Sequence, residues 1–198
     1  MLLKAAQARF RYCLTIDREI KQASAGQLKA VQDKLNQQMN GSVGMFNFAL
    51  PLVFSAFLMM LSFAMMQFSL WQAVTQLLGL PRTMTMVLLV VGSLLCGALY
   101  VMPVFLMAKG RMVGLSLHLL LARATLGGAV IYLLCALVGG FSGGVSAGGN
   151  LICPLLALAF MGLSFWLIRT ERFYSSLLFA LFCRTLRKAQ TARLTHRK

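Results

Sequence analysis

Acidic residues are almost absent from this sequence. Only four of its 198 residues are Asp or Glu, and none lies between Asp33 and Glu171. Without a carboxylate in this long region, a Ser-His-Asp or intramembrane aspartyl mechanism has no acid, and a metal site lacks ligands. Transport coupled to protons or sodium usually needs an intramembrane Asp or Glu, which is also missing. These absences predict a protein that is not an enzyme and that binds no metal or cofactor.

Metal-binding and redox motifs are missing as well. The five cysteines form no C-x-x-C pair and no Cys/His zinc spacing, and there are only two histidines. One disulfide remains a hypothesis: Cys135 and Cys153 end one apolar segment and begin the next, at similar depth in a membrane, and an oxidising compartment would allow them to pair.

Charge of either sign is scarce, whereas apolar residues are abundant. Charged residues make up 12% of the sequence and apolar residues 59%, with a mean hydropathy of +0.78. About 20 helical residues cross the roughly 30 Å of hydrocarbon in a bilayer. Four apolar windows meet this length, at about 45–68, 84–107, 117–140 and 150–168. The sequence therefore predicts an all-α, polytopic membrane protein with four transmembrane helices, and it excludes a soluble enzyme domain.

Basic residues gather at the two ends of the chain. Seven of the 19 Lys and Arg precede residue 35, and eight lie from Arg169 onwards. Lys109 and Arg111 lie between the second and third windows, and Arg82 lies between the first and second. Because basic loops stay on the cytoplasmic side, both termini are predicted to be cytoplasmic, in a bacterial inner membrane, with a glycine-rich outer loop at 139–150. Topology accounts for the net charge of +15, so nucleic acid is not an expected partner.

The segments before and after the windows are amphipathic. The sequence divides into an arm (1–44), a transmembrane bundle (45–168) and a basic tail (169–198). The arm has one apolar helical face, formed by Ala6, Phe10, Cys13, Ile16 and Ile20. In the tail, an apolar run too short to cross a membrane leads into a basic end. We expect both segments to lie on anionic lipid headgroups, with docking to a partner protein or a second copy as the alternative.

Small residues recur at helix-packing spacing within the windows. Ser93 and Gly97 are four residues apart in the second window, as are Ala124 and Gly128 in the third, and Gly162 lies in the fourth. Such spacing allows helices to approach closely, so we expect close helix–helix contacts at these positions.

One basic residue, Arg123, lies within or near the third apolar window, with Ser116 and His118 close by in sequence. Ser116, seven residues away, shares its helical face, whereas His118 is rotated by about 140°. Arg123 is either a functional intramembrane charge that faces an anion or a partner's carboxylate, or a residue whose side chain reaches the cytoplasmic headgroups because the span begins near Ala122.

These features favour a non-enzymatic inner-membrane subunit or accessory protein of a larger assembly, such as a secretion, conjugation or envelope complex. Its expected partners are other membrane proteins or a second copy, contacted through helices. Two alternatives remain open: an immunity or exclusion protein that intercepts a pore-forming toxin or transfer machinery in the membrane, and a small channel or transporter that works without carboxylates.

Overall fold

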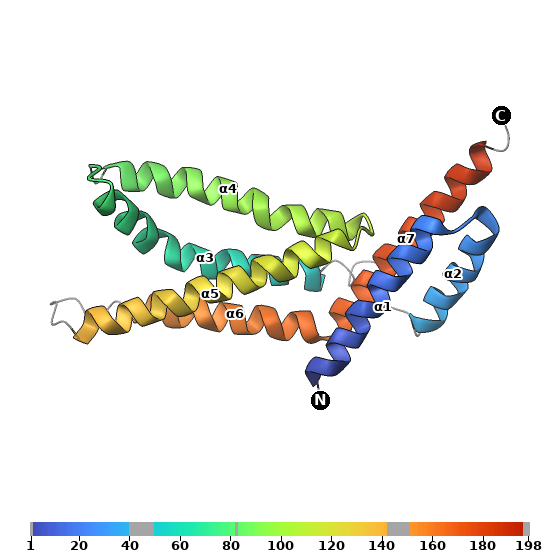
Figure 1. The fold of residues 1–198 in the computed structure, drawn as a ribbon, viewed down its shortest axis with the longest axis horizontal. Helices are drawn as coiled ribbons and strands as arrows, with labels where there is room; N and C mark the ends of the chain where they lie inside the picture. The colour runs from blue at the N-terminus through green and yellow to red at the C-terminus, as the bar shows by residue number, and fades with distance from the viewer. Residues whose placement is uncertain (1, 40–49, 82, 142–150, 196–198) are drawn as a thin grey trace. The chain divides into compact units, whose positions relative to one another are not determined.

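The computed structural model describes residues 2–39, 50–81, 83–141 and 151–195. In these ranges the chain is helical, with no strand (Figure 1). The helices are α1 (Leu2–Gln22), α2 (Ala25–Gln38), α3 (Leu50–Leu77), α4 (Thr83–Ala108), α5 (Val113–Phe141), α6 (Ile152–Arg169) and α7 (Glu171–Thr195). The prediction of an all-α fold is confirmed.

Four of these helices are long and apolar enough to cross a membrane. They are α3, α4, α5 over Val113–Val138, and α6. The prediction of four candidate transmembrane helices is thus confirmed, although α3 continues past residue 68 to Leu77 and α5 begins earlier than 117, at Val113. The first five residues of the first predicted window, 45–49, lie outside the described ranges.

Two glycines end the first two of these helices. Gly79 follows α3 and Gly110 follows α4, and both have positive φ, a conformation that glycine adopts without steric cost. In each case the next residue's N–H bonds five residues back, from Leu80 to Thr75 and from Arg111 to Leu106, both at 2.9 Å. These are Schellman motifs, which satisfy the last carbonyls of a helix and stop it.

By contact density the chain divides into two compact units. The first unit comprises Met1–Val53, Pro103–Leu117 and Trp166–Lys198, and the second comprises Phe54–Met102 and His118–Phe165. The first unit contains all four acidic residues and 17 of the 19 basic ones, whereas the second contains only Arg82 and Arg123. Charge is therefore segregated between the units. Arg82 itself lies outside the described residues.

In the first unit, α1, α2 and α7 pack against one another, and we call them the three-helix cluster (Figure 1). Its buried apolar residues include Cys13, Ile16, Ile20, Leu28, Val31, Leu35, Phe173, Leu177, Leu178 and Leu181. The sequence predicts the apolar faces of the arm and the tail to rest on lipid, but the structure buries them against each other.

Charged side chains connect the three-helix cluster to the turn after α4. Asp17 is only 4% exposed and accepts hydrogen bonds from Arg184 and from Lys21, the latter at 2.8 Å. Arg184 also donates to the Gly110 carbonyl at 2.9 Å. A Cβ at Gly110 would lie 2.6 Å from the Ala180 carbonyl oxygen, so the turn packs directly on α7.

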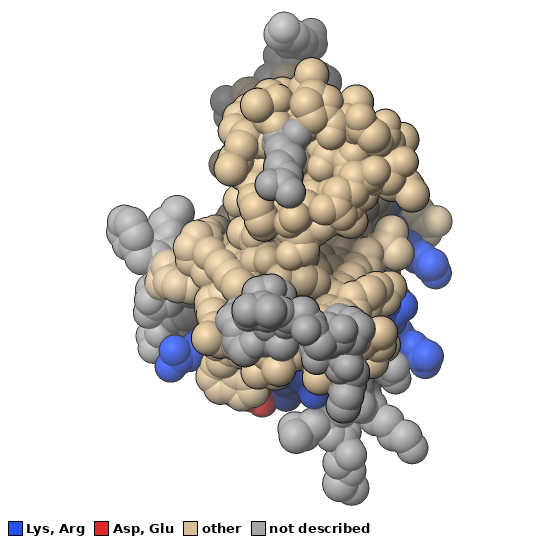
Figure 2. Space-filling model, turned by 90° about the vertical axis from the view of Figure 1, so that its left-hand side faces the viewer, with Lys and Arg blue, Asp and Glu red and all other residues tan. Residues whose placement is uncertain are grey.

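The second unit has a small core and a largely apolar exterior. Met66, Ala129 and Ala157 form its core cluster, with Phe63 and Tyr132 packed against it. Along the most apolar stretches, 44% of α3 is buried but only 17% of α4 and of α5. In the view of Figure 2 most of the described surface carries neither acidic nor basic side chains. Outward apolar faces of this kind suit helices in contact with lipid.

Candidate functional site

Polar side chains inside the second unit pair with one another across helices. Ser55 Oγ and His118 Nε2 are 3.0 Å apart, and Ser164 Oγ donates to the Ser55 carbonyl at 3.0 Å. Other pairs are Ser69 with Tyr132 at 3.1 Å, Thr75 with Thr85 at 3.0 Å, and Tyr100 with Thr125 at 2.5 Å. Between them these bonds join α3 to α4, α5 and α6, and α4 to α5. In an apolar surrounding such bonds hold helices together, by about 0.6 kcal/mol each on average.

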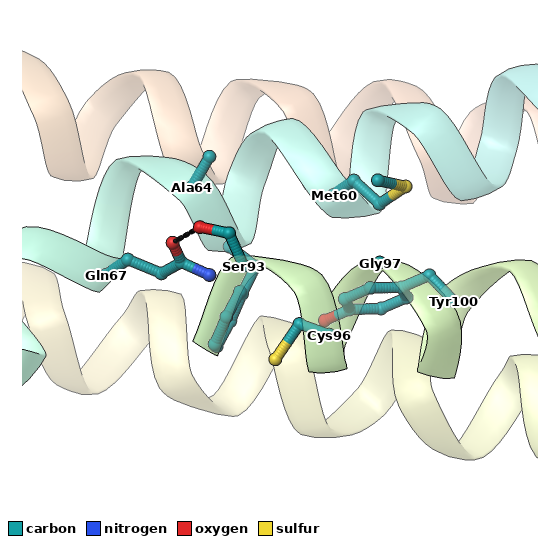
Figure 3. A pocket seen from close by; sticks show the side chains of 8 residues that line it. Met60, Ala64, Gln67, Ser93, Cys96, Gly97 and Tyr100 are labelled. Carbon is teal, nitrogen blue, oxygen red and sulfur yellow. Dashed lines mark hydrogen bonds between the residues drawn. The ribbon is translucent and has the colours of Figure 1, made fainter. Parts of the chain in front are cut away.

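The candidate pocket lies between α3 and α4 (Figure 3). It has a volume of about 90 Å³ and is lined by Met60, Phe63, Ala64, Gln67, Ser93, Cys96, Gly97 and Tyr100. Ser93 Oγ lies 2.7 Å from Gln67 Oε1 and 2.7 Å from the Leu89 carbonyl oxygen, and its single hydroxyl hydrogen can be donated to either of them. The space is large enough to admit water. Its lining contains no Lys, Arg, His, Asp or Glu.

The three polar residues singled out on α5 are placed differently. His118 is fully buried and belongs to the interior pairs, whereas Arg123 is exposed. Ser116 is exposed too, in the part of α5 that belongs to the first unit. Within the described ranges Arg123 makes no hydrogen bond or ion pair. The structure therefore separates His118 from Arg123, as their rotation around the helix requires.

Arg123 belongs to an exposed strip of α5 that we call the α5 outer face, formed by Leu120, Arg123, Ala124, Gly127 and Ile131. Leu120 and Ile131 are 61% and 62% exposed. Between them lie the charge and two small residues. A Cβ at Gly127 would meet no atom within 4 Å. The strip is therefore a shallow, open surface with one cation in its middle.

The exposed side of α4 has a different composition. It carries the large apolar residues Val90, Val91, Leu94, Leu95 and Leu99, together with the smaller Ser93 and Ala98. An apolar surface of this kind suits contact with lipid chains. This side of α4 carries no charge among its described residues, whereas the α5 outer face carries Arg123.

The predicted small-residue contacts form at some positions and not at others. A Cβ at Gly97 would lie 3.8 Å from Met60 Cε, and one at Gly128 would lie 3.6 Å from Met66 Cε, so both face α3. Ala124 is exposed on α5. A Cβ at Gly162 would meet nothing within 4 Å, so Gly162 takes no part in close packing in this chain.

Two closer approaches were not foreseen from the sequence. A Cβ at Gly92 would lie 2.7 Å from Trp71 Cζ2, and one at Gly114 would lie 2.6 Å from the Pro103 carbonyl oxygen. Gly92 directly precedes Ser93 and is four residues before Cys96, so the same four-residue spacing could have identified it.

The cysteines are unpaired in the structure. Cys135 is exposed and Cys153 is half-buried, and both are free cysteines, so the disulfide considered from the sequence stays a prediction. Most of the glycine-rich outer loop, residues 142–150, lies outside the described ranges.

Comparison with known proteins adds no relative: no family model, curated protein or solved structure matches the chain. Among the described residues, no group of three or more His, Cys, Asp or Glu side chains could hold a metal ion. The geometry of the helices is therefore the basis for a functional proposal.

Proposed function

We propose that this protein is a non-enzymatic subunit or accessory protein of a larger assembly in a bacterial inner membrane, and that it works through helix–helix contacts. The observation that carries the proposal is the α5 outer face, where the charged Arg123 is exposed beside the small residues Ala124 and Gly127, whereas the exposed side of α4 carries no charge among its described residues. Small residues let another helix approach closely, while a surface that meets only lipid has no need of them.

The position of Arg123 along α5 supports the proposal. Arg123 lies ten residues after Val113, about 15 Å along the helix, and 15 residues before Val138, about 22 Å. A charged side chain near the middle of a transmembrane helix costs about 2.5–3.5 kcal/mol on insertion scales. An interaction in an assembly would offset this cost, and the chain provides none among its described residues.

The arrangement of the first unit supports the proposed topology. α1, α7 and the turn after α4 all belong to this unit, which supports a topology that gives them the same side of the membrane. With four spans, an even number, the two termini would also lie on the same side of the membrane. Because this unit carries 17 of the 19 basic residues, the positive-inside rule assigns it to the cytoplasm.

Photo-crosslinking in native membranes tests the proposal. A photoreactive amino acid replaces Gly127 on the α5 outer face, and in the matched control it replaces Leu94, which is 71% exposed on α4. We expect protein adducts from position 127 and lipid adducts from position 94. Lipid adducts alone from both positions would show that α5 has no protein neighbour and would refute the proposal.

A further inference from the structure

We infer that the α5 outer face binds a transmembrane helix of another protein, and that this helix carries an Asp or Glu that pairs with Arg123. The inference rests on the proposed function and specifies the chemistry of its partner. It is carried by three observations: the exposure of Arg123, the lack of any acid in the unit that contains it, and the small residues beside it.

A carboxylate is the group that best complements Arg123. The guanidinium presents a planar fork of N–H donors, which a carboxylate accepts through two parallel hydrogen bonds. In an apolar surrounding such a pair is screened little, so it contributes to both affinity and register. A neutral partner helix would leave the cation uncompensated in lipid.

The carboxylate has to come from a different protein. The sequence has no Asp or Glu between Asp33 and Glu171, and all four acids belong to the first unit. Three of them, Asp17, Glu19 and Glu171, already form ion pairs with Lys or Arg of that unit. A second copy docked through the same face would bring another Arg123 and like-charge repulsion. Charge complementarity therefore excludes self-association through the α5 outer face.

The surface around Arg123 favours a helix over a lipid headgroup. Ala124 adjoins Arg123 in sequence, and Gly127 follows one turn later, with open space where a Cβ would be. This open space lets a second helix backbone come close enough for its short Asp or Glu side chain to reach the guanidinium. Binding of a lipid headgroup would require only that the Arg123 side chain reaches the membrane interface. Small neighbouring residues would not strengthen that binding.

Crosslinking from position 127 tests the inference when it is combined with substitutions of Arg123. Arg123→Lys keeps the charge, Arg123→Leu removes it, and Arg123→Glu reverses it. We expect the Lys variant to keep most of the yield of protein adduct. In the Leu and Glu variants the yield should fall by about tenfold or more, because the ion pair is lost. Arg111→Leu, an exposed base in the turn after α4, is the matched control and should leave the adduct unchanged.

Mass spectrometry of the adduct supplies a second readout. The crosslinked peptide should come from an apolar segment that contains an Asp or Glu, and replacing that acid with Arg should restore the adduct in the Arg123→Glu variant. Because Arg123 makes no bond to described residues, the abundance of the variants in the membrane should equal that of the wild type.

The possible failures are distinguishable. No protein adduct with Arg123 intact would refute the proposed function itself. A protein adduct whose yield is the same in the Leu and Glu variants, or whose peptide has no acid, would refute this inference and leave the proposed function standing. A lipid adduct from a photoreactive residue at position 124, with no protein adduct there, would assign Arg123 to a phosphate headgroup instead.

Discussion

The neighbours of each glycine decide what a single added methyl group would cost in this protein. In a helix, replacing glycine with alanine stabilises by about 0.5–1 kcal/mol when space is available, because alanine loses less backbone entropy. Where the new Cβ overlaps a rigid neighbour, overpacking costs about 1–3 kcal/mol and reverses the sign. Gly92 and Gly162 represent these two cases, since the first faces the Trp71 ring and the second faces open space.

We therefore predict opposite effects of two identical substitutions. Gly92→Ala places a Cβ 2.7 Å from Trp71 Cζ2. This overlap should lower the free energy of unfolding by about 1–3 kcal/mol and so lower the thermal unfolding midpoint in detergent. Gly162→Ala, the control, should leave the midpoint unchanged or raise it slightly. Equal shifts for both variants would mean that Trp71 does not pack on Gly92 in the folded protein.

At the scale of whole elements, the helices at the two ends of the chain pack against each other. The apolar stripe of α1 is covered by α7 and α2. The rings of Phe10 and Phe173 are in edge-to-face contact, with their centroids 6.3 Å apart. Lys188 of α7 donates to the carbonyls of Ile20 and Ala23 at 2.7 and 3.2 Å, at the end of α1. A cation there satisfies the last carbonyls of the helix and interacts favourably with its dipole.

Burial within the three-helix cluster changes the chemistry of Cys13. Burial raises the pKa of its thiol to about 12, because the thiolate is poorly solvated there. The pKa of Cys183 on α7 is raised as well, for the same reason. Since the thiolate is the reactive form, alkylation of Cys13 is suppressed at ordinary pH and increases only as pH rises towards the raised pKa.

We predict that Cys13 resists maleimide at pH 8 while the protein is folded. With a pKa of about 12, only about one thiol in ten thousand is ionised at pH 8, before steric protection is counted. The matched control is Thr15→Cys in a Cys13→Ala background, which presents a thiol on the exposed side of the same helix. Labelling by mass shift should be at least about a hundredfold slower for Cys13, and both should react in SDS. Similar rates in the folded protein would contradict the packing of α1 against α7.

At the scale of the whole molecule, charge and packing coincide. The unit that contains both terminal regions and the turn after α4 is also the unit with nearly all the charge. The charged residues are thus concentrated in one of the two units, although the segments of this unit alternate along the sequence with those of the other. Such separation is what a protein requires when one part lies in water and the other in lipid.

This arrangement predicts the pattern of labelling in intact cells. In a cysteine-free background, Lys109→Cys in the turn after α4 and Gln190→Cys in α7 should both be protected from a membrane-impermeant maleimide. Leu80→Cys, in the exposed turn after α3 of the second unit, should react. Permeabilised cells should label all three. The reverse pattern would invert the orientation, and different results at positions 109 and 190 would contradict the packing of the first unit.

The sequence by itself determined the helices, the four apolar spans and the apolar face of α1, because length, hydropathy and periodicity are local properties of the chain. Only the tertiary structure decided which faces are covered and by what. The spans are apolar on nearly every side, so their periodicity does not indicate which side faces inward, and Gly92 and Gly162 look alike until a neighbouring helix is present. The interior pairing of His118 and the outward position of Arg123 likewise depend on how α5 is rotated against α3, and that rotation is set by contacts between residues far apart in the sequence.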